Sequence, residues 1–169
     1  MRDTNKPSWT RYSRSKPRKS YIKAMPHQDI TQFRMGAMKP DYNVTFRLIS
    51  KQNIQIRDNA LESARQALNK YLEKAMLGNF YFVIRVFPHQ VIRENKMIAG
   101  AGADRLQKGM RQSFGRATDK AARVRKSQEV LTITTYKDKI STINVAIDRA
   151  LKKLPGDYSV VMEEKKAAA

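Results

Sequence analysis

Hydrophobic and polar residues alternate with period two in several stretches of the chain, and this spacing predicts β-strands. In residues 43–49, Val44, Phe46 and Leu48 fall on one face of such a strand. The stretch FYFVIRVFP at 80–88 is rich in aromatic and β-branched residues, which predicts a central strand buried on both faces. Further strand segments are expected at 54–56, 89–98, 129–136 and 157–163.

Two other stretches have apolar residues at helical spacing. The first helix should begin at 58–59, where Asn59 as the N-cap would form a capping box with Glu62, and should end near Gly78. The second should run from about 139 to 154. Both patterns are typical of amphipathic helices that pack one face on a core, so no chemistry is assigned to them.

The order of these elements predicts an α/β (α+β) fold. We expect a two-layer sandwich, in which a mixed β-sheet has two helices on one face. With 169 residues, of which 41% are hydrophobic, the chain is long enough for one domain with a real core. Within the domain 1–169 we expect an extended basic arm at 1–40, an α/β core at 41–162 with a long basic glycine-containing loop at about 99–127, and a loose tail at 163–169.

Charge changes this picture most, because 34 Lys and Arg stand against 15 Asp and Glu, a net charge of +19. Segments 1–24 and 97–126 hold 13 of the 19 excess charges, in the parts where regular structure is weakest. A densely negative partner is the simplest explanation, with nucleic acid first and an anionic membrane surface second. The chain has no cysteine, which excludes disulfides and zinc sites built on thiolates. It also has no apolar run long enough to span a membrane.

The predicted arm interleaves aromatic with basic residues, a pattern typical of binding to single-stranded RNA. Basic side chains bind phosphates, while aromatic faces stack on unpaired bases. The alternative for Trp9 and Tyr12 is that they attach the arm to the domain. The candidate RNA-binding residues of the arm are Arg2, Lys6, Trp9, Arg11, Tyr12, Arg14, Lys16, Arg18, Lys19 and Lys23.

The stretch GAGADRLQKGMRQSFGR at 100–116 opens like a nucleotide-binding turn, but its context fails. The dinucleotide fingerprint needs a third glycine where Arg105 stands, and Gly109 is followed by Met110 rather than by lysine. We therefore expect no cofactor, and instead a basic loop that becomes ordered on RNA. The candidate RNA-binding residues in and beside this loop are Arg93, Lys96, Arg105, Lys108, Arg111, Arg116, Lys120, Arg123, Arg125 and Lys126.

Residues for catalysis or metal binding do not gather in the sequence. The two histidines, His27 and His89, follow prolines rather than acidic residues. Asp104 and Asp119 lie among Arg and Lys, where they would orient those side chains rather than hold two metal ions. We expect no enzymatic activity, no catalytic residues, no metal and no small-molecule substrate.

Three blocks of the sequence together resemble a known family. They are IQIRDNALESARQALNKYLEK at 54–74, IRVFPHQVIRENKM at 84–97, and GAGADRLQKGMRQSFGRA at 100–117. In combination, and in order from about Lys6 to Val161, they are similar to the archaeal and eukaryotic L-ten-e group of large-subunit ribosomal proteins, part of the universal L-sixteen family.

This resemblance implies a hammerhead-type α/β fold that binds large-subunit rRNA beside the tRNA-binding cleft of cytoplasmic ribosomes. It implies that the glycine-containing loop points toward tRNA and the peptidyl-transferase region, with Arg105, Lys108, Arg111 and Arg116 nearest. Neighbouring ribosomal proteins would be further partners, and a membrane would not. Three alternatives are a non-ribosomal RNA-binding or ribosome-assembly factor, an RNA-acting enzyme, and a membrane-surface binder, although the mixed charge of both helices disfavours the last.

Overall fold

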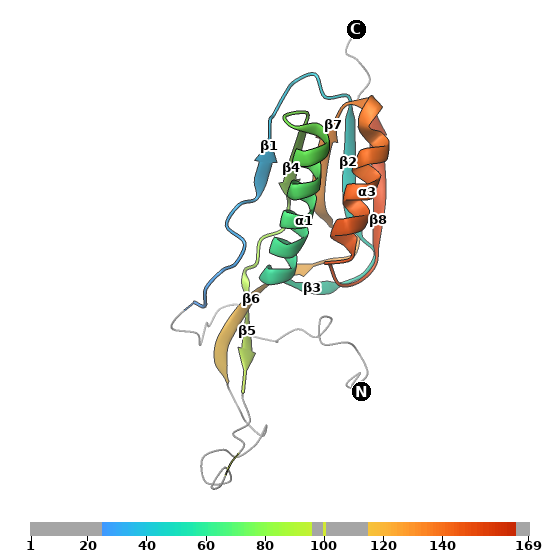
Figure 1. Cartoon of the computed structure of the whole chain (residues 1–169). Helices are drawn as coiled ribbons and strands as arrows, with labels where there is room; N and C mark the ends of the chain where they lie inside the picture. The colour runs from blue at the N-terminus through green and yellow to red at the C-terminus, as the bar shows by residue number, and fades with distance from the viewer. Residues whose placement is uncertain (1–24, 96–99, 101–114, 165–169) are drawn as a thin grey trace.

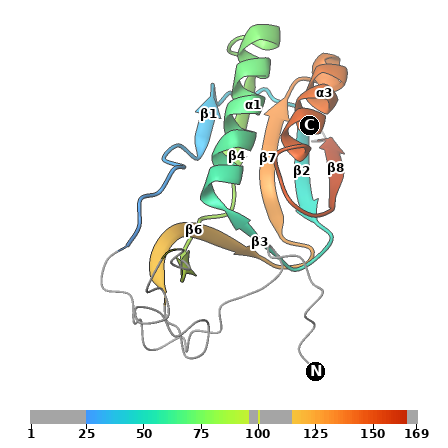
Figure 2. The ribbon, with the colours of Figure 1, turned by 60° about the horizontal axis from the view of Figure 1, so that its bottom comes forward.

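The computed structural model describes residues 25–95, 100 and 115–164. Its main body is a two-layer sandwich made of a five-stranded sheet and two helices that lie side by side across one face of that sheet (Figures 1 and 2). The strands are β1 (Arg34–Gly36), β2 (Val44–Ser50), β4 (Phe80–Ile84), β7 (Glu129–Thr135) and β8 (Tyr158–Glu164), and the helices are α1 (Asp58–Met76), η2 (Lys137–Lys139, a 3-10 turn) and α3 (Ile140–Leu151). The order in the sheet is β1-β4-β7-β2-β8.

The alternation along β2 decides which side chains enter the core. Val44, Phe46 and Leu48 are at most 2% exposed. Phe46 is aligned with Ile133 of β7, and Ile133 is aligned in turn with Phe82 of β4. The three inner strands thus present one continuous apolar face, and burying a side chain of this size contributes roughly 1.5–3 kcal/mol. The helices cover it with Leu61, Leu68 and Leu72 of α1 and Ile143, Ala146 and Ile147 of α3.

The other face of the sheet is polar, and its charged groups bind one another. A guanidinium nitrogen of Arg47 lies 2.8 Å from a carboxylate oxygen of Glu163 on β8, and Nε lies 3.9 Å from Glu129. Nε of Arg85 donates to the hydroxyl of Thr132 at 2.9 Å, and that hydroxyl donates to Glu129 at 2.6 Å. Both arginines therefore have partners within the fold.

A second, smaller sheet extends from one end of the sandwich (Figure 1). It consists of β3 (Ile54–Arg57), β6 (Arg116–Val124) and β5 (Gln90–Glu94), in the order β3-β6-β5. Ile54, Ile56 and Val124 belong to the same hydrophobic core as the sandwich, so this sheet is anchored where β3 meets β6. Strands β5 and β6 form a two-stranded antiparallel unit that we call the basic ribbon.

The structure confirms the predicted sandwich with two helices on one face, and corrects details of the sheet. Every strand pairing in the described part of the chain is antiparallel, so the expected mixed sheet is wrong. The expected strand at 80–88 ends at Ile84. It is not buried on both faces, because Tyr81 and Val83 are half-buried on the polar side. The central strand is instead β7.

Two expected irregular segments contain ordered structure. The arm was expected to extend to residue 40, but β1 pairs with β4 and Ile30 is fully buried, so the fold already includes these residues. The loop was expected at about 99–127, but 116–124 are β6, stabilised by partners on both sides. The last strand also runs to Glu164, two residues beyond the expected end of the core.

The start of the first helix differs from expectation, whereas its end does not. Helix α1 has Arg57 at the N-cap position with no side-chain cap, so the capping box of Asn59 with Glu62 is wrong. The buried carboxylate of Asp58 instead accepts hydrogen bonds from the backbone N–H groups of Asn59 and Asp29, close to the positive end of the helix. At the other end, the predicted stop near Gly78 is confirmed, and this glycine has φ +71°.

Candidate nucleic-acid interface

The basic ribbon has an irregular backbone that starts at Gly115. At φ +69° this glycine lies so near β5 that a Cβ would be 2.9 Å from the carbonyl carbon of Glu94, a contact that only glycine avoids. Between Ile92 and Arg93 the register shifts by one residue in a β-bulge. The hydroxyl of Thr118, the additional residue of β6, donates to the carbonyl of Ile92 at 3.3 Å. Bulges of this kind increase local twist and bend a ribbon.

Basic residues outnumber acidic ones on the smaller sheet. Arg116 and Arg123 of β6 are exposed, and Lys120 and Arg93 are half-buried. The amine of Lys120 donates to the side-chain carbonyl of Gln28 at 3.2 Å, which connects the ribbon to the segment before β1. The charged residues of this sheet are Arg57, Arg93, Arg116, Lys120 and Arg123 against Glu94 and Asp119.

The turn after β6 places two further basic side chains in solvent. Arg125 and Lys126 are exposed, while their backbone groups are fixed. The N–H of Arg125 donates to the side-chain carbonyl of Gln128 at 2.9 Å, and the N–H of Lys126 donates to that of Asn53 at 2.8 Å. Ser127 completes the turn with φ +65°. This turn therefore presents two adjacent cations on a backbone that is already ordered.

Asp119 was expected to orient the Arg and Lys residues beside it in the sequence, but the basic partner that the structure shows is a more distant residue. The partner comes from another strand, since a carboxylate oxygen of Asp119 lies 3.9 Å from the guanidinium of Arg57 on β3. Both side chains are about half exposed, at 45% and 55%, so water screens the pair and it contributes little to stability. Asp104, the other acidic residue of the predicted loop, lies outside the described residues.

Of the predicted site residues, the structure describes Arg93, Arg116, Lys120, Arg123, Arg125 and Lys126, all on the basic ribbon or in the turn after β6. The pairing of β5 with β6 aligns Arg93 with Ala117, next to Arg116, whereas Arg125 and Lys126 lie beyond the other end of β6. The others lie outside the described residues: Arg2, Lys6, Trp9, Arg11, Tyr12, Arg14, Lys16, Arg18, Lys19, Lys23, Lys96, Arg105, Lys108 and Arg111.

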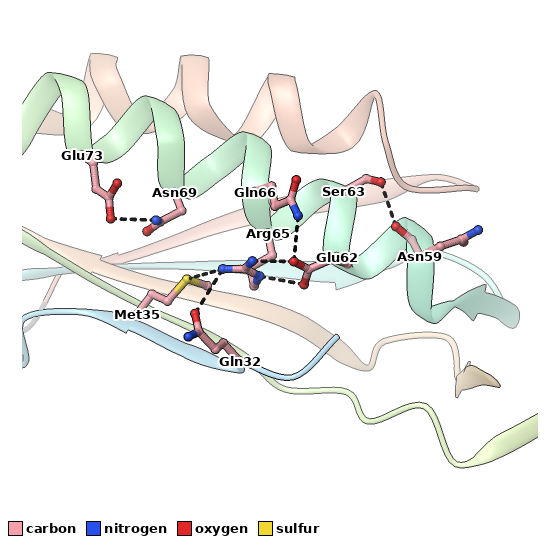
Figure 3. Close-up of polar contacts among 9 residues, drawn as sticks. All are labelled: Gln32, Met35, Asn59, Glu62, Ser63, Arg65, Gln66, Asn69 and Glu73. Carbon is pink, nitrogen blue, oxygen red and sulfur yellow. Dashed lines mark hydrogen bonds and ion pairs between the residues drawn. The ribbon is translucent and has the colours of Figure 1, made fainter. Parts of the chain in front are cut away.

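Some basic residues are committed to the fold rather than to a partner. Arg65 of α1 donates to both carboxylate oxygens of Glu62, through Nε at 2.7 Å, and also contacts Gln32 and the sulfur of Met35 (Figure 3). Its hydrogen bonds lower the pKa of Glu62, and Glu62 raises the pKa of Arg65. Net charge along the chain therefore overstates the charge available to a partner.

The histidines do not form a catalytic or metal site in the described part of the chain. Nε2 of the exposed His27 lies 3.9 Å from a carboxylate oxygen of Asp29, a neighbour two residues later that we did not anticipate. The ring of His89 packs on Phe87. Among the described residues no three His, Asp or Glu side chains lie where they could hold a metal ion, and no helix is both long and apolar enough to cross a membrane.

One surface feature was missed in the sequence. Phe87 was assigned to a buried strand, but it follows the end of β4 and is 45% exposed. Its ring stacks on that of Phe33 with centroids 5.3 Å apart. The signal in the sequence was Pro88, which disfavours a continuous central strand and should have placed the strand end before it.

Comparisons with known proteins agree with the sequence resemblance. The family model for ribosomal protein L16p/L10e matches residues 7–161. A protein of Methanococcus aeolicus named large ribosomal subunit protein uL16 is 45% identical over 163 residues, which are 95% of this chain and 90% of that protein. Proteins of the same name from Methanoculleus marisnigri and Hyperthermus butylicus are 41% and 44% identical, over 89% and 90% of this chain and 89% and 87% of their own.

Proposed function

This chain belongs to the ribosomal protein L16p/L10e family, and from that premise we propose that its basic ribbon and the turn after it bind large-subunit rRNA. Like the relatives it matches, the chain is a structural constituent of the large ribosomal subunit, located in cytoplasmic ribosomes, and not an enzyme. Neighbouring ribosomal proteins are accordingly among its partners. A free RNA-binding or assembly factor is not favoured by these relatives.

The observation that carries the proposal is a row of exposed cations along one strand. Arg116 and Arg123 lie on β6, and Arg125 and Lys126 lie in the turn directly after it. Each lysine or arginine that neutralises a phosphate releases condensed counterions, so binding of this kind is strong and weakens with salt. A twisted two-stranded ribbon also follows the shape of folded RNA without reading its sequence.

The arm and the glycine-containing loop extend the proposal to residues outside the described part. We propose that the basic arm residues bind rRNA phosphates, and that Arg105, Lys108 and Arg111 face tRNA together with Arg116. Two facts support this proposal, namely the positive charge of these residues and the position of the loop in the fold. The loop joins β5 to β6, so its ends start from the ribbon that carries the exposed cations. Binding along an RNA backbone requires this continuity of positive charge.

Salt-dependent binding to transcribed large-subunit rRNA tests the ribbon. Replacing Arg116, Arg125 and Lys126 with Ala should reduce the slope of log affinity against log salt by about 2–3, because each lost phosphate contact removes about 0.7–0.9 from it. The matched control replaces Lys70, Lys74 and Lys152, which are exposed on or beside the two helices. It removes the same charge elsewhere, and an equal change of slope in both variants would refute a localised site.

A further inference from the structure

Three rings form a ladder where the sandwich meets the basic ribbon. Phe33 and Phe87 stack with centroids 5.3 Å apart and ring planes 26° apart, and His89 lies 4.7 Å from Phe87 at 48°. Phe33 directly precedes β1, and the other two lie in the connection between β4 and β5. The ladder therefore consists of residues from two segments that are more than 50 positions apart in the sequence.

The backbone between the two strands holds Phe87 and His89 at the surface. In this connection Val86 and Pro88 are buried, whereas Phe87 and His89 are exposed. The N–H of His89 donates to the carbonyl of Phe87 at 3.0 Å, which closes a three-residue turn around Pro88. The N–H of Ile84 donates to the carbonyl of Phe33 at 2.8 Å, which fixes the first ring beside the second. The ladder is thus already ordered, so little conformational entropy is lost when a flat partner stacks on it.

Exposure distinguishes Phe87 from the core phenylalanines. Phe46, Phe80 and Phe82 are at most 2% exposed, while Phe87 is 45% exposed. Its ring stacks on Phe33 and also contacts the tilted ring of His89, which still leaves Phe87 45% exposed. Single exposed apolar residues such as Leu77 are normal, but Phe87 is exposed as part of a group of three rings that contact one another.

The surroundings of the ladder are cationic. Arg34, next to Phe33, is exposed, and so is Arg85, two residues before Phe87, although Nε of Arg85 also donates to Thr132. Lys120 of the basic ribbon donates to Gln28, in the same short segment that carries Phe33. An aromatic surface flanked by basic groups combines the two features that bind single-stranded nucleic acid, namely a stacking platform and contacts for phosphates.

We propose that the ladder Phe33–Phe87–His89 is a stacking site for one unpaired base of RNA, which contacts the exposed surface shared by Phe87 and His89. The proposal rests on the rRNA-binding function above and adds a second mode of contact to it. The basic ribbon recognises phosphates, whereas the ladder recognises the π-face of a base that has left its helix. Every base has such a face, so the site tolerates sequence but requires a single-stranded nucleotide.

The test uses the full chain and a single-stranded RNA oligonucleotide that contains 2-aminopurine, a fluorescent base quenched by stacking. Phe87→Leu keeps an apolar side chain but removes the π-face, and it should lower affinity by about 5- to 150-fold and reduce the quenching. Its salt slope should equal that of the unsubstituted protein, because no phosphate contact is lost. Phe87→Tyr should bind like the unsubstituted protein.

The matched control is Leu77→Ala, which removes an apolar side chain that is 78% exposed at the end of α1. It should leave affinity and quenching unchanged. If Phe87→Leu lowers the melting temperature, quenching is measured in His89→Leu instead. This variant removes an exposed ring while Phe87 is kept, and it should also reduce the quenching. Unchanged affinity and quenching in the folded variants would overturn the stacking site, whereas failure of the unsubstituted chain to bind rRNA in a salt-dependent way would overturn the proposed function itself.

Discussion

The buried carboxylate of Asp58 accepts a hydrogen bond from the backbone N–H of Asp29, at 3.1 Å across 29 positions of sequence. Asp58 is the first residue of α1, and its other carboxylate oxygen accepts the N–H of Asn59. One side chain thus fastens the segment that leads into β1 to the start of the main helix. At this point a polar contact adds to the apolar packing of Ile30, the buried neighbour of Asp29.

Replacing Asp58 with Ala should lower the free energy of unfolding by about 1–3 kcal/mol, because two backbone N–H groups lose their acceptor. Asp58→Asn, which keeps one acceptor oxygen, should cost less. Chemical denaturation measures both. The control is Asp41→Ala, an exposed aspartate in the loop before β2. A loss for Asp41→Ala as large as that for Asp58→Ala would contradict the role of the contact.

The pair of Glu62 and Arg65 should make the free energy of unfolding depend on pH in the acidic range. Hydrogen bonds from Arg65 hold the pKa of Glu62 below its ordinary value of 4.5 in the folded protein. A carboxylate with a depressed pKa contributes stability that is present above the unfolded-state pKa and is lost as pH falls through the folded-state pKa. The difference in unfolding free energy between the unsubstituted protein and Glu62→Gln should therefore shrink on acidification. A difference that stays constant with pH would contradict this assignment.

Alanine substitutions at two glycines with positive φ distinguish the cost of backbone strain from the cost of a steric clash. A Cβ at Gly36, with φ +88°, would lie 2.2 Å from the backbone oxygen of Phe80, whereas one at Gly78, with φ +71°, would meet no atom within 4 Å. Gly78→Ala should cost about 1–2 kcal/mol from the left-handed backbone alone. Gly36→Ala should cost clearly more, since β1 must also move away from β4. Thermal unfolding of the two variants measures the difference, and equal melting temperatures would show that β1 yields freely.

The proposed contact with tRNA predicts a variant that folds but functions poorly. Replacing Lys108, Arg111 and Arg116 with Ala removes three positive charges and no apolar side chain, so the melting temperature of the isolated chain should be almost unchanged. Incorporation into large subunits, measured on sucrose gradients, or tRNA binding by those subunits should fall. Normal values of both would contradict a role for the loop.

The sequence predicted those helices and strands whose apolar residues recur at a regular spacing. The alternation of Val44, Phe46 and Leu48 and the helical spacing in α1 and α3 gave the sandwich, because burial on one face imposes a period on the chain. Strand β6, by contrast, contains few β-branched residues and looked like a loop. It is a strand because β3 and β5 pair with it from both sides, and such distant pairings leave no periodic signal.

The candidate site was predictable in part for the same reason. Clustered charge along the chain indicated Arg116 to Lys126, because these residues follow one another along a single strand and the turn after it. Charge counting ignored the i,i+3 spacing that lets Arg65 bind Glu62 within α1. The further contact of Arg65 with Met35 depends on which face of α1 meets β1, which local spacing does not show. Charge counting also could not find Phe87, whose partner Phe33 comes from a segment that was assigned to the arm.

The turn between β6 and β7 has a mechanical consequence. The N–H of Ser127 donates to the carbonyl of Ser50 at 2.8 Å, and the N–H of Ser50 donates to that of Gln128 at 3.0 Å. These bonds fasten the turn to the end of β2, at the point where β6 leaves the sandwich. A force that displaces the ribbon is thus transmitted through the backbone to the five-stranded sheet. The ribbon is thus rigidly connected to the rest of the domain. If the ribbon is attached to a fixed surface, this connection sets the orientation of both helices at once.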